Sequence, residues 1–307
     1  MIPDVFQKVI LIINPASGKG TRKNIISEAV NKVRIVYPEC ECYYTSKSGD
    51  ARQFADKLKE TPGLLFIVLG GDGTINEVIN GLGEKSKVIF TVLPIGSGND
   101  FCKTAGYSRD IDQLIERISN PVIRPIDSGL LQFTSKSQQF SLNRYFVSSS
   151  GLGFDGLVAK ISNRKSILKG ILLYLSSVIV ALGRFKPVEI EALIDEETIR
   201  GKKFLVSLGN GKTSGGGFLL TPEAELDDGL LDVCIADDIS NFRVFTLLPK
   251  AINGSHIREK EIYYAKFSKM ELKIKTGFII HYDGEVMECE PGILKVENKY
   301  KVLKILR

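Results

Sequence analysis

The stretch that decides the fold is residues 64–82, which read LLFIVLGGDGTINEVINGL. Six apolar residues in a row, Leu64–Leu69, are typical of a strand buried on both faces of a sheet. The loop Gly70-Gly71-Asp72-Gly73-Thr74 follows at once, and Thr74–Leu82 has helical spacing. Glycines let backbone N–H groups approach a ligand closely, and a helix N-terminus favours anions, so phosphate is the expected occupant. Asp72 would repel a phosphate unless Mg²⁺ lay between them. The motif therefore indicates a metal–nucleotide, and it exceeds what a plain glycine turn requires.

Strand and helix signals alternate on both sides of this unit, which predicts a mostly parallel, doubly wound sheet with helices on both faces. Two further loops of small and polar residues, Asn14–Gly20 and Pro94–Phe101, follow the first and fourth predicted strands. Ligands of open parallel sheets bind outside the carboxyl ends of the strands, so three loops should converge on one crevice. The other elements expected in this half are strands at 9–14, 40–45 and 88–94 and helices at 21–36 and 51–59.

From Arg124-Pro125-Ile126-Asp127 onward the pattern changes to strands with few helices between them, which predicts an antiparallel sheet or sandwich. We therefore expect a nucleotide-binding α/β domain at residues 1–127 and a β-sandwich substrate domain at 128–299. A last strand at 300–306 could pair in either domain. The expected strands of this half are 129–133, 145–149, 187–193, 203–208, 231–236, 263–267, 271–275 and 278–282, with helices near 167–184 and 240–252.

Composition excludes several classes of protein. With 43% hydrophobic and 25% charged residues among 307, the chain is close to the globular average, which excludes a disordered tail, a collagen-like chain and a coiled coil. The net charge of +5 lacks the dense basic stripe of a nucleic-acid domain, although it suits anionic ligands or an anionic membrane surface. Five scattered cysteines and two histidines argue against a zinc site and predict free thiols in a reducing cytosol. The N-terminus shows no secretory signal.

Two other phosphate-binding motifs, the P-loop and the dinucleotide fingerprint, are not complete in this sequence. Gly18-Lys19 lacks the glycine that a P-loop places five residues before its lysine. The stretch Gly151–Gly156 matches G-x-G-x-x-G, but Lys169 and Gly170 stand where a dinucleotide site needs an acidic residue.

In the second half, Pro222–Asp232 holds five carboxylates in eleven residues, which suits either a Mg²⁺ or Ca²⁺ site or an acidic hairpin turn. Asp283-Gly284-Glu285 has the pattern of a hairpin turn with a carboxylate on the far strand.

Taken together, these motifs resemble the bacterial diacylglycerol kinase family of soluble lipid kinases, relatives of the sphingosine and ceramide kinases. The resemblance runs from residue 9 to about 306. It implies an N-terminal α/β domain of NAD-kinase-like architecture and a C-terminal β-sandwich, with the active site in the cleft between them. The motifs that carry it are Asn14–Gly18, Gly70–Glu77, Leu93–Phe101, Gly153-Phe154-Asp155, Pro222–Asp232 and Asp283-Gly284-Glu285.

The resemblance also implies residue roles. Asp72 would belong to an Asp–water–Mg²⁺ network, and Asp100 would lie beside the acceptor. Glu285 would be the general base. Asp155 is the alternative, because the sphingosine-type relatives have sometimes favoured this position as the base. Ser97 stands where the family more often has threonine, which keeps the hydroxyl. A structural Mg²⁺ or Ca²⁺ would be held by Asp228 with backbone oxygens near Glu225 and Leu230. ATP would be surrounded by Asn14, Pro15, Ala16, Ser17, Gly18, Thr45, Gly71, Asp72, Gly73, Thr74, Ile75, Asn76, Glu77 and Ser97.

One apolar stretch, Ile171–Leu182, is too short for the ~20 residues of a bilayer crossing. Its basic flanks allow it to rest on an anionic membrane, and a buried helix with a solvated end is the alternative. A lipid kinase needs access to a bilayer, which favours the first interpretation. The flanking basic residues are Lys160, Arg164, Lys165, Lys169, Arg184 and Lys186.

The sequence therefore predicts a cytoplasmic, peripherally membrane-associated lipid kinase that uses ATP and Mg²⁺ to phosphorylate a lipid hydroxyl, foremost that of diacylglycerol. Phosphatidylglycerol, undecaprenol-like alcohols and sphingoid bases stay open as acceptors. Two other interpretations are NAD kinase, which shares the Gly-Gly-Asp-Gly-Thr loop, and a nucleotide-binding regulator without turnover. Exposed sandwich edges would permit a homodimer. No nucleic-acid partner is expected.

Overall fold

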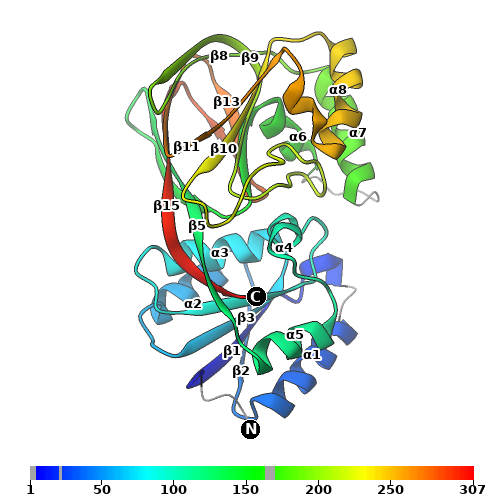
Figure 1. Ribbon diagram of the computed structural model, residues 1–307, viewed down its shortest axis with the longest axis vertical. Coiled ribbons are helices and arrows are strands. Elements are labelled where there is room, and N and C mark those ends of the chain that lie inside the picture. Colours follow the sequence, from blue (N-terminus) through cyan, green and yellow to red (C-terminus); the bar gives the residue numbers. More distant parts are fainter. Residues whose placement is uncertain (1–4, 21–22, 163–169) are drawn as a thin grey trace. The chain divides into compact units, whose positions relative to one another are not determined.

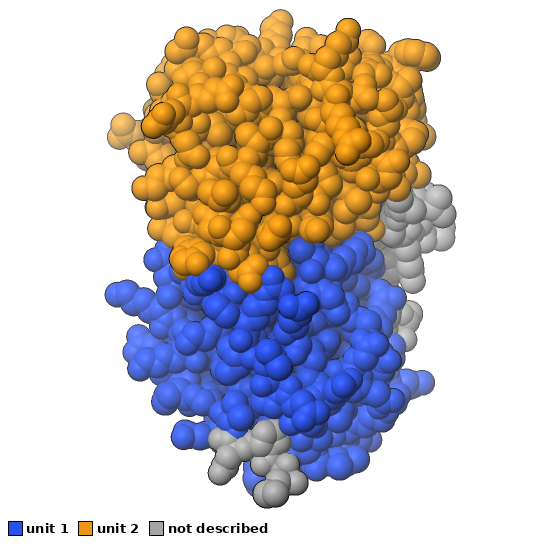
Figure 2. Space-filling view, in the orientation of Figure 1, with its two compact units in different colours: residues 1–126, 301–307 blue, residues 127–300 orange. Residues whose placement is uncertain are grey.

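The computed structural model describes residues 5–20, 23–162 and 170–307. Its chain divides into two compact units, residues 1–126 with 301–307 and residues 127–300 (Figure 2). Strands β5 (Ile123–Ser135) and β15 (Gly292–Leu306) each contribute residues to both units. The fold class predicted from the sequence is confirmed, with a parallel α/β unit first and an antiparallel β-sandwich second.

The first unit is built on a parallel sheet in the order β15-β4-β3-β1-β2. All seven residues of β3 (Leu64–Gly70) are buried, as expected for a central strand covered on both faces. On one face, side chains of Val9, Leu11 and Ile13 belong to one core cluster with residues of the first and fifth helices. The remaining strands are β1 (Lys8–Ile13), β2 (Glu41–Tyr44) and β4 (Ile89–Pro94).

Helices connect these strands (Figure 1). On the face opposite α1 and α5, Phe54 of α2 stacks on Tyr43 with 3.8 Å between ring centroids, and it also approaches Phe66 of β3. Helix α5 begins at Ile111 because the Asp110 carboxylate accepts from the N–H groups of Asp112 and Gln113. The helices are α1 (Lys23–Val36), α2 (Asp50–Leu58), α3 (Asp72–Leu82), α4 (Asp100–Ala105) and α5 (Ile111–Ser119), with a short 3-10 turn at Ser17–Gly20.

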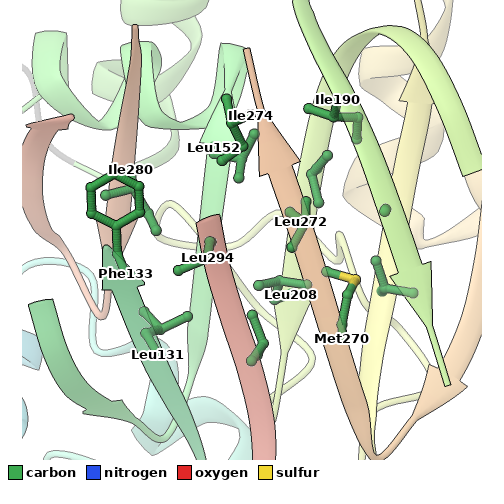
Figure 3. Close-up of a cluster of buried hydrophobic side chains, with 14 of the residues drawn as sticks. Leu131, Phe133, Leu152, Ile190, Leu208, Met270, Leu272, Ile274, Ile280 and Leu294 are labelled. Carbon is green, nitrogen blue, oxygen red and sulfur yellow. The ribbon is translucent and has the colours of Figure 1, made fainter. Parts of the chain in front are cut away.

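The second unit is a β-sandwich whose inward-facing side chains form one apolar core. Figure 3 shows Leu131, Phe133, Leu152, Leu272 and Leu294 pointing into it, the first two from β5 and the others each from another strand. Apart from β5 and β15, whose bounds are given above, its strands are β6 (Ser141–Phe146), β7 (Ser149–Gly153), β8 (Val188–Ile194), β9 (Glu197–Gly209), β10 (Leu231–Asp237), β11 (Ile262–Phe267), β12 (Lys269–Ile274), β13 (Phe278–Tyr282) and β14 (Glu285–Cys289).

Three helices of this unit pack on a second apolar cluster (Figure 1). They are α6 (Phe154–Ser162), α7 (Gly170–Leu182) and α8 (Asn241–Asn253), and a 3-10 turn at Ser255–Arg258 follows α8. Within the described ranges, no helix is both long enough and apolar enough to cross a bilayer. Residues 167–169 of the helix predicted at 167–184 lie outside the described residues.

Several expected elements differ from the observed ones. The strand predicted at 145–149 is wrong, because β6 ends at Phe146 and β7 starts only at Ser149. The intervening N–H groups are turned toward the Asp283 carboxylate instead of a neighbouring strand. Helix α3 begins two residues earlier than predicted, and β15 begins at Gly292 instead of Tyr300. Helices α4, α5 and α6 were not predicted, and β14 was expected only as the far strand of the hairpin at Asp283-Gly284, without bounds.

Candidate functional site

In the first unit, the carboxylate of Asp72 joins the loops that follow β3 and β4. Its Oδ2 accepts from the backbone N–H of Asn99 at 2.6 Å, and its Oδ1 accepts from that of Asp100 at 2.7 Å. Asn99 has a left-handed backbone, with φ of 55°, and the N–H groups of this residue and the next both reach the same carboxylate. Asp72 is thus held in one orientation by two charge-assisted hydrogen bonds.

Close approach of the same two loops explains two of their glycines. A Cβ on Gly96 would lie 2.5 Å from the Cα of Gly71, and a Cβ on Gly98 would lie 2.7 Å from Asp72 Oδ2. The guanidinium of Arg109 braces the second loop by donating to the carbonyl oxygens of Pro94 and Gly96, at 3.2 and 2.7 Å. Directly after the braced Gly96, Ser97 is exposed, which leaves its hydroxyl open to a ligand.

The loop after β1 is tied to the same helix, α3. Asn14 donates through Nδ2 to Thr74 Oγ1 at 2.9 Å, and its Oδ1 accepts from the N–H of Ala16 at 3.0 Å. Pro15 and Ala16 are exposed, whereas Ser17 and Gly18 are partly buried. The loops after β1, β3 and β4 are therefore connected through Asn14–Thr74 and Asp72–Asn99 at the carboxyl edge of the sheet.

Several other residues expected around ATP hold the surrounding helices and strands in place. Glu77 accepts from the N–H groups of Gly49 and Ala51 at 2.8 and 3.1 Å, which fixes the start of α2. Thr45 continues the β2 ladder by donating its N–H to the Ile13 carbonyl oxygen. Ile75 and Asn76 of α3 are buried, so their side chains pack inside the unit. Gly71 and Gly73 are partly exposed beside Asp72. Asp100 is mostly buried and pairs with Lys103 at 3.2 Å.

In the second unit, Asp155 and His281 form a buried pair. His281 Nε2 lies 2.9 Å from Asp155 Oδ2, and the two side chains are 4% and 1% exposed, histidine first. Asp155 is the second residue of α6, and His281 lies on β13. A Cβ on Gly151 would lie 2.3 Å from Asp155 Oδ2 and 3.0 Å from His281 Nε2, so only glycine leaves room for the pair.

Glu285 follows a turn that a second aspartate holds in place. Asp283 and Gly284 both have positive φ, 45° and 88°, as a two-residue hairpin turn of type I′ requires. The buried Asp283 carboxylate accepts from the N–H groups of Val147, Ser148 and Ser149 at 2.8 to 3.1 Å. The exposed Glu285 is the first residue of β14, and its backbone is fixed by this turn.

An apolar cavity of about 70 Å³ also lies in the second unit. Asp155 is the one carboxylate among its lining residues, and burial lowers the pKa of His256 in the same wall. The cavity thus combines an apolar lining with one acidic group. It is lined by Phe154, Asp155, Val178, Phe204, Leu205, Phe218, Leu220, Ala236, Ile239, Val244, Leu247, Leu248, Ala251, His256 and Ile262.

In the acidic stretch of the second unit, the carboxylates of Asp228 and Asp232 both have partners within the protein. Asp228 accepts from the N–H of Leu230 at 3.1 Å and pairs with the Lys266 ammonium at 2.5 Å. Nearby, burial raises the pKa of Asp232 to about 6, and one of its carboxylate oxygens has no hydrogen-bond partner among the described residues. Glu225 is exposed. Across the described part of the chain, no group of three or more His, Cys, Asp or Glu side chains could hold a metal ion.

Sequence reasoning missed three of the residues that position these groups. Asn99, Arg109 and His281 were given no site role, and Asp283 was treated only as a turn residue. The Asp283-Gly284 pair did carry a signal, because it is the typical sequence of a type I′ turn. His281 carried none, since its partner Asp155 lies 126 positions away in the chain.

We expect Gly151→Ala to separate Asp155 from His281, because the added Cβ has no room beside the carboxylate. The chain has only two histidines, so imidazole NMR can follow the His281 ring directly once His256→Gln has assigned the signals. The Nε2 proton should be protected from exchange in the parent protein and lost in Gly151→Ala. Gly277→Ala, whose Cβ would meet only an ordinary contact at 3.5 Å, is the matched control. An unchanged His281 signal in Gly151→Ala would contradict the assignment.

Comparison with known families agrees with this architecture. Residues 8–131 match the diacylglycerol kinase catalytic domain, and residues 148–307 match the YegS C-terminal NAD kinase beta sandwich-like domain. A diacylglycerol kinase of Bacillus subtilis is 30% identical over 302 residues, which cover 96% of this chain and 95% of the relative. One from Staphylococcus epidermidis is 29% identical over 281 residues, covering 90% and 84%.

Solved structures support the fold. A putative diacylglycerol kinase from Bacillus anthracis superposes with a TM-score of 0.77 at 20% identity, covering 98% of this chain and 97% of that one. Yeast NADH kinase in complex with NADH superposes with a TM-score of 0.53 at 12% identity, covering 97% and 82%. These two likenesses concern the fold alone. The family matches and the Bacillus subtilis relative go further, and they show that this chain belongs to the diacylglycerol kinase family of lipid kinases.

Proposed function

We propose that this lipid kinase transfers the γ-phosphoryl group of ATP, bound as its Mg²⁺ complex, to the hydroxyl group of diacylglycerol, which yields phosphatidic acid. The observation that carries the proposal is the Asp72 carboxylate, held between two glycine loops at the carboxyl edge of the parallel sheet. The relatives from Bacillus subtilis and Staphylococcus epidermidis, which are named diacylglycerol kinases, support this choice of acceptor.

The glycine loops are suited to the triphosphate. Gly71, Gly73 and Ser97 are at least partly exposed, so backbone N–H groups and one hydroxyl are available to phosphate oxygens. The Asp72 carboxylate is oriented by the two loop N–H groups, and a carboxylate oxygen can accept more than one hydrogen bond, which suits water in the shell of a metal ion. When bound, Mg²⁺ would neutralise charge on the phosphates, which is a large part of catalysis in phosphoryl transfer. Asp72 therefore fits an indirect, water-mediated metal contact.

The apolar cavity of the second unit supports a lipid acceptor over a nucleotide acceptor. Its lining is aliphatic and aromatic apart from Asp155 and His256, which suits an acyl chain near a single polar group. At about 70 Å³ it holds only a short segment of chain. We propose that an acyl chain enters by displacing side chains of α8, since Val244, Leu247, Leu248 and Ala251 form one wall.

For the acceptor we propose Glu285 as general base. Its carboxylate takes the hydroxyl proton as the lipid oxygen forms a bond to the γ-phosphorus, and the bond from that phosphorus to the bridging oxygen breaks to release ADP. The turn held by Asp283 fixes the backbone from which Glu285 projects. We propose that Asp155, oriented by His281 on the cavity wall, orients the lipid near its hydroxyl.

We expect labelled phosphate from ATP to appear on diacylglycerol in mixed micelles with Mg²⁺, and chelation of Mg²⁺ to abolish the transfer. Asp72→Asn should lower turnover at least about a hundredfold, because an amide cannot accept from both loop N–H groups. Glu285→Gln should lower it by about the same factor through loss of the base. Glu288→Gln, a change at an exposed glutamate on the same strand, is the control.

The acceptor panel should contain phosphatidylglycerol, an undecaprenol-like alcohol, a sphingoid base and NAD beside diacylglycerol. Transfer to NAD alone would overturn the lipid proposal in favour of the NAD kinase interpretation. ATP binding with no transfer to any acceptor would instead favour a regulator without turnover.

A structural cation at Asp228 is a second part of the proposal. In the structure the Lys266 ammonium neutralises this carboxylate, so a cation held by Asp228 with the backbone oxygens of Glu225 and Leu230 must displace it. Mg²⁺ should then raise the melting temperature by several degrees, because a ligand bound only to the folded state stabilises it. Asp228→Asn should remove the shift, and Glu223→Gln should keep it. An equal shift in Asp228→Asn would exclude this site, and a larger shift with Ca²⁺ would identify the preferred ion.

Contact with a membrane surface is the third part. Among the described side chains of α7 and α8, five large apolar ones are exposed, Ile179, Val180, Phe242, Phe245 and Ile252, although both helices pack on the same inner cluster. Arg184 and Lys186 follow α7 and are exposed, whereas Arg164, Lys165 and Lys169 lie outside the described residues. Apolar side chains beside basic ones suit an anionic bilayer.

The double variant Phe242→Ser/Phe245→Ser should bind anionic vesicles at least about tenfold more weakly in flotation, since each buried phenyl ring contributes more than 1 kcal/mol. Transfer to a short-chain, water-soluble diacylglycerol should persist. Ile35→Ser, at an equally exposed apolar residue of α1, is the control. Full vesicle binding by the double variant would mean that another surface makes the contact.

A further inference from the structure

The first unit contains a second, larger cavity that none of the proposed roles uses. Its volume is about 640 Å³, within the range of small-molecule sites. It lies at the C-terminal end of α4, beside α5, where β5 starts and β15 ends. The lining residues are Thr104, Ala105, Gly106, Tyr107, Gln113, Glu116, Arg117, Asn120, Arg124 and Arg307. All belong to the first unit.

Positive charge dominates this lining. Three guanidinium groups come from three separate parts of the chain, Arg117 from α5, Arg124 from β5 and Arg307 from the residue after β15. The lining includes one acidic side chain, Glu116. Arginine in the last turn of a helix commonly stabilises the helix dipole, which accounts for Arg117. It does not account for Arg124 and Arg307, which lie on no helix.

The guanidinium of Arg117 is held in a fixed orientation. Its carbon lies 4.3 Å from the centre of the Tyr107 ring, and one terminal nitrogen donates to the Val92 carbonyl oxygen at 3.2 Å. The Tyr107 hydroxyl in turn donates to the Leu306 carbonyl oxygen. The Nε of Arg117 is buried and has no hydrogen-bond partner among the described residues, and burial lowers the pKa of the group. Arg117 is thus held in one orientation in the cavity lining.

We propose that this cavity binds a phosphomonoester dianion. Arginine presents paired donors that match phosphate oxygens, and the three guanidinium groups in this lining outnumber its one carboxylate. The neutral polar groups of Thr104, Gln113 and Asn120 suit the remainder of a small polar molecule. The site is distinct from the nucleotide loops, because α4 separates them. Asp72 contacts the first residue of this helix, and the cavity lies at its far end, about 9 Å along six residues.

Binding should be measured by isothermal titration of the full-length protein with glycerol 3-phosphate, once alone and once with saturating ATP and Mg²⁺ and no lipid. Vesicles with and without phosphatidic acid form a second arm, because a lipid headgroup can carry the same phosphomonoester. Arg124→Gln/Arg307→Gln is the informative variant, since it leaves the half-buried Arg117 in place. Arg200→Gln, at an exposed arginine of the second unit, is the control.

We expect glycerol 3-phosphate to bind with and without ATP, and the double variant to weaken it at least about tenfold, as the loss of hydrogen bonds to a charged group does. Arg200→Gln should leave the affinity unchanged. Stronger binding to vesicles with phosphatidic acid than to vesicles without it, lost in the same double variant, would also support the site. It would identify the lipid headgroup as the source of the phosphomonoester. Competition by ATP would overturn the proposal by assigning the phosphate to the nucleotide loops. Unchanged affinity in the double variant, or equal binding of glycerol without phosphate, would overturn it as well.

Discussion

The first unit depends on a carboxylate that accepts hydrogen bonds from the backbone of a distant loop. Asp72 starts α3 and fixes the loop after β4 through two N–H groups, and Asn99 must adopt a left-handed backbone to supply one of them. The two loops approach so closely that Gly96 cannot carry a side chain. Backbone geometry at the predicted phosphate site therefore follows from one charged side chain, since removing its charge would weaken both bonds and loosen both loops.

The second unit uses the same device. Asp283 accepts from three consecutive N–H groups, those of the two linking residues Val147 and Ser148 and that of Ser149, the first residue of β7. Its own turn leads into β14, which begins at Glu285. The link cannot form ladder bonds there, which is why β6 and β7 are two strands rather than one. In both units an aspartate replaces missing backbone partners, and a residue with a proposed catalytic role lies within two positions of that contact. Burial of Asp283 is compensated because three donors satisfy its charge.

Sequence reasoning predicted the strands of the first unit well and those of the second less well, for a physical reason. A parallel strand such as β3 is buried on both faces and is therefore a continuous apolar run, followed by a glycine loop at a known edge. The second unit depends on partners far apart in the chain, as in the pairing of Asp155 with His281 or of Asp283 with Val147. Local sequence patterns do not predict which distant residues will pair. For this reason strand 145–149 was predicted across a break, and His281 was left without a role.

The likeness to yeast NADH kinase shows why the acceptor must be argued from the second unit. A Gly-Gly-Asp-Gly-Thr loop on a parallel sheet serves any nucleotide whose phosphates need neutralising, so it does not separate a lipid acceptor from a dinucleotide. In this chain the second unit has an apolar cavity whose one carboxylate, Asp155, is buried and paired with His281. Burying an unpaired carboxylate would be costly, and pairing with an imidazole at 2.9 Å reduces that cost while leaving a polar group at an apolar wall. An apolar chain with one hydroxyl near its end matches this combination, whereas a dinucleotide would leave most of its polar groups without partners.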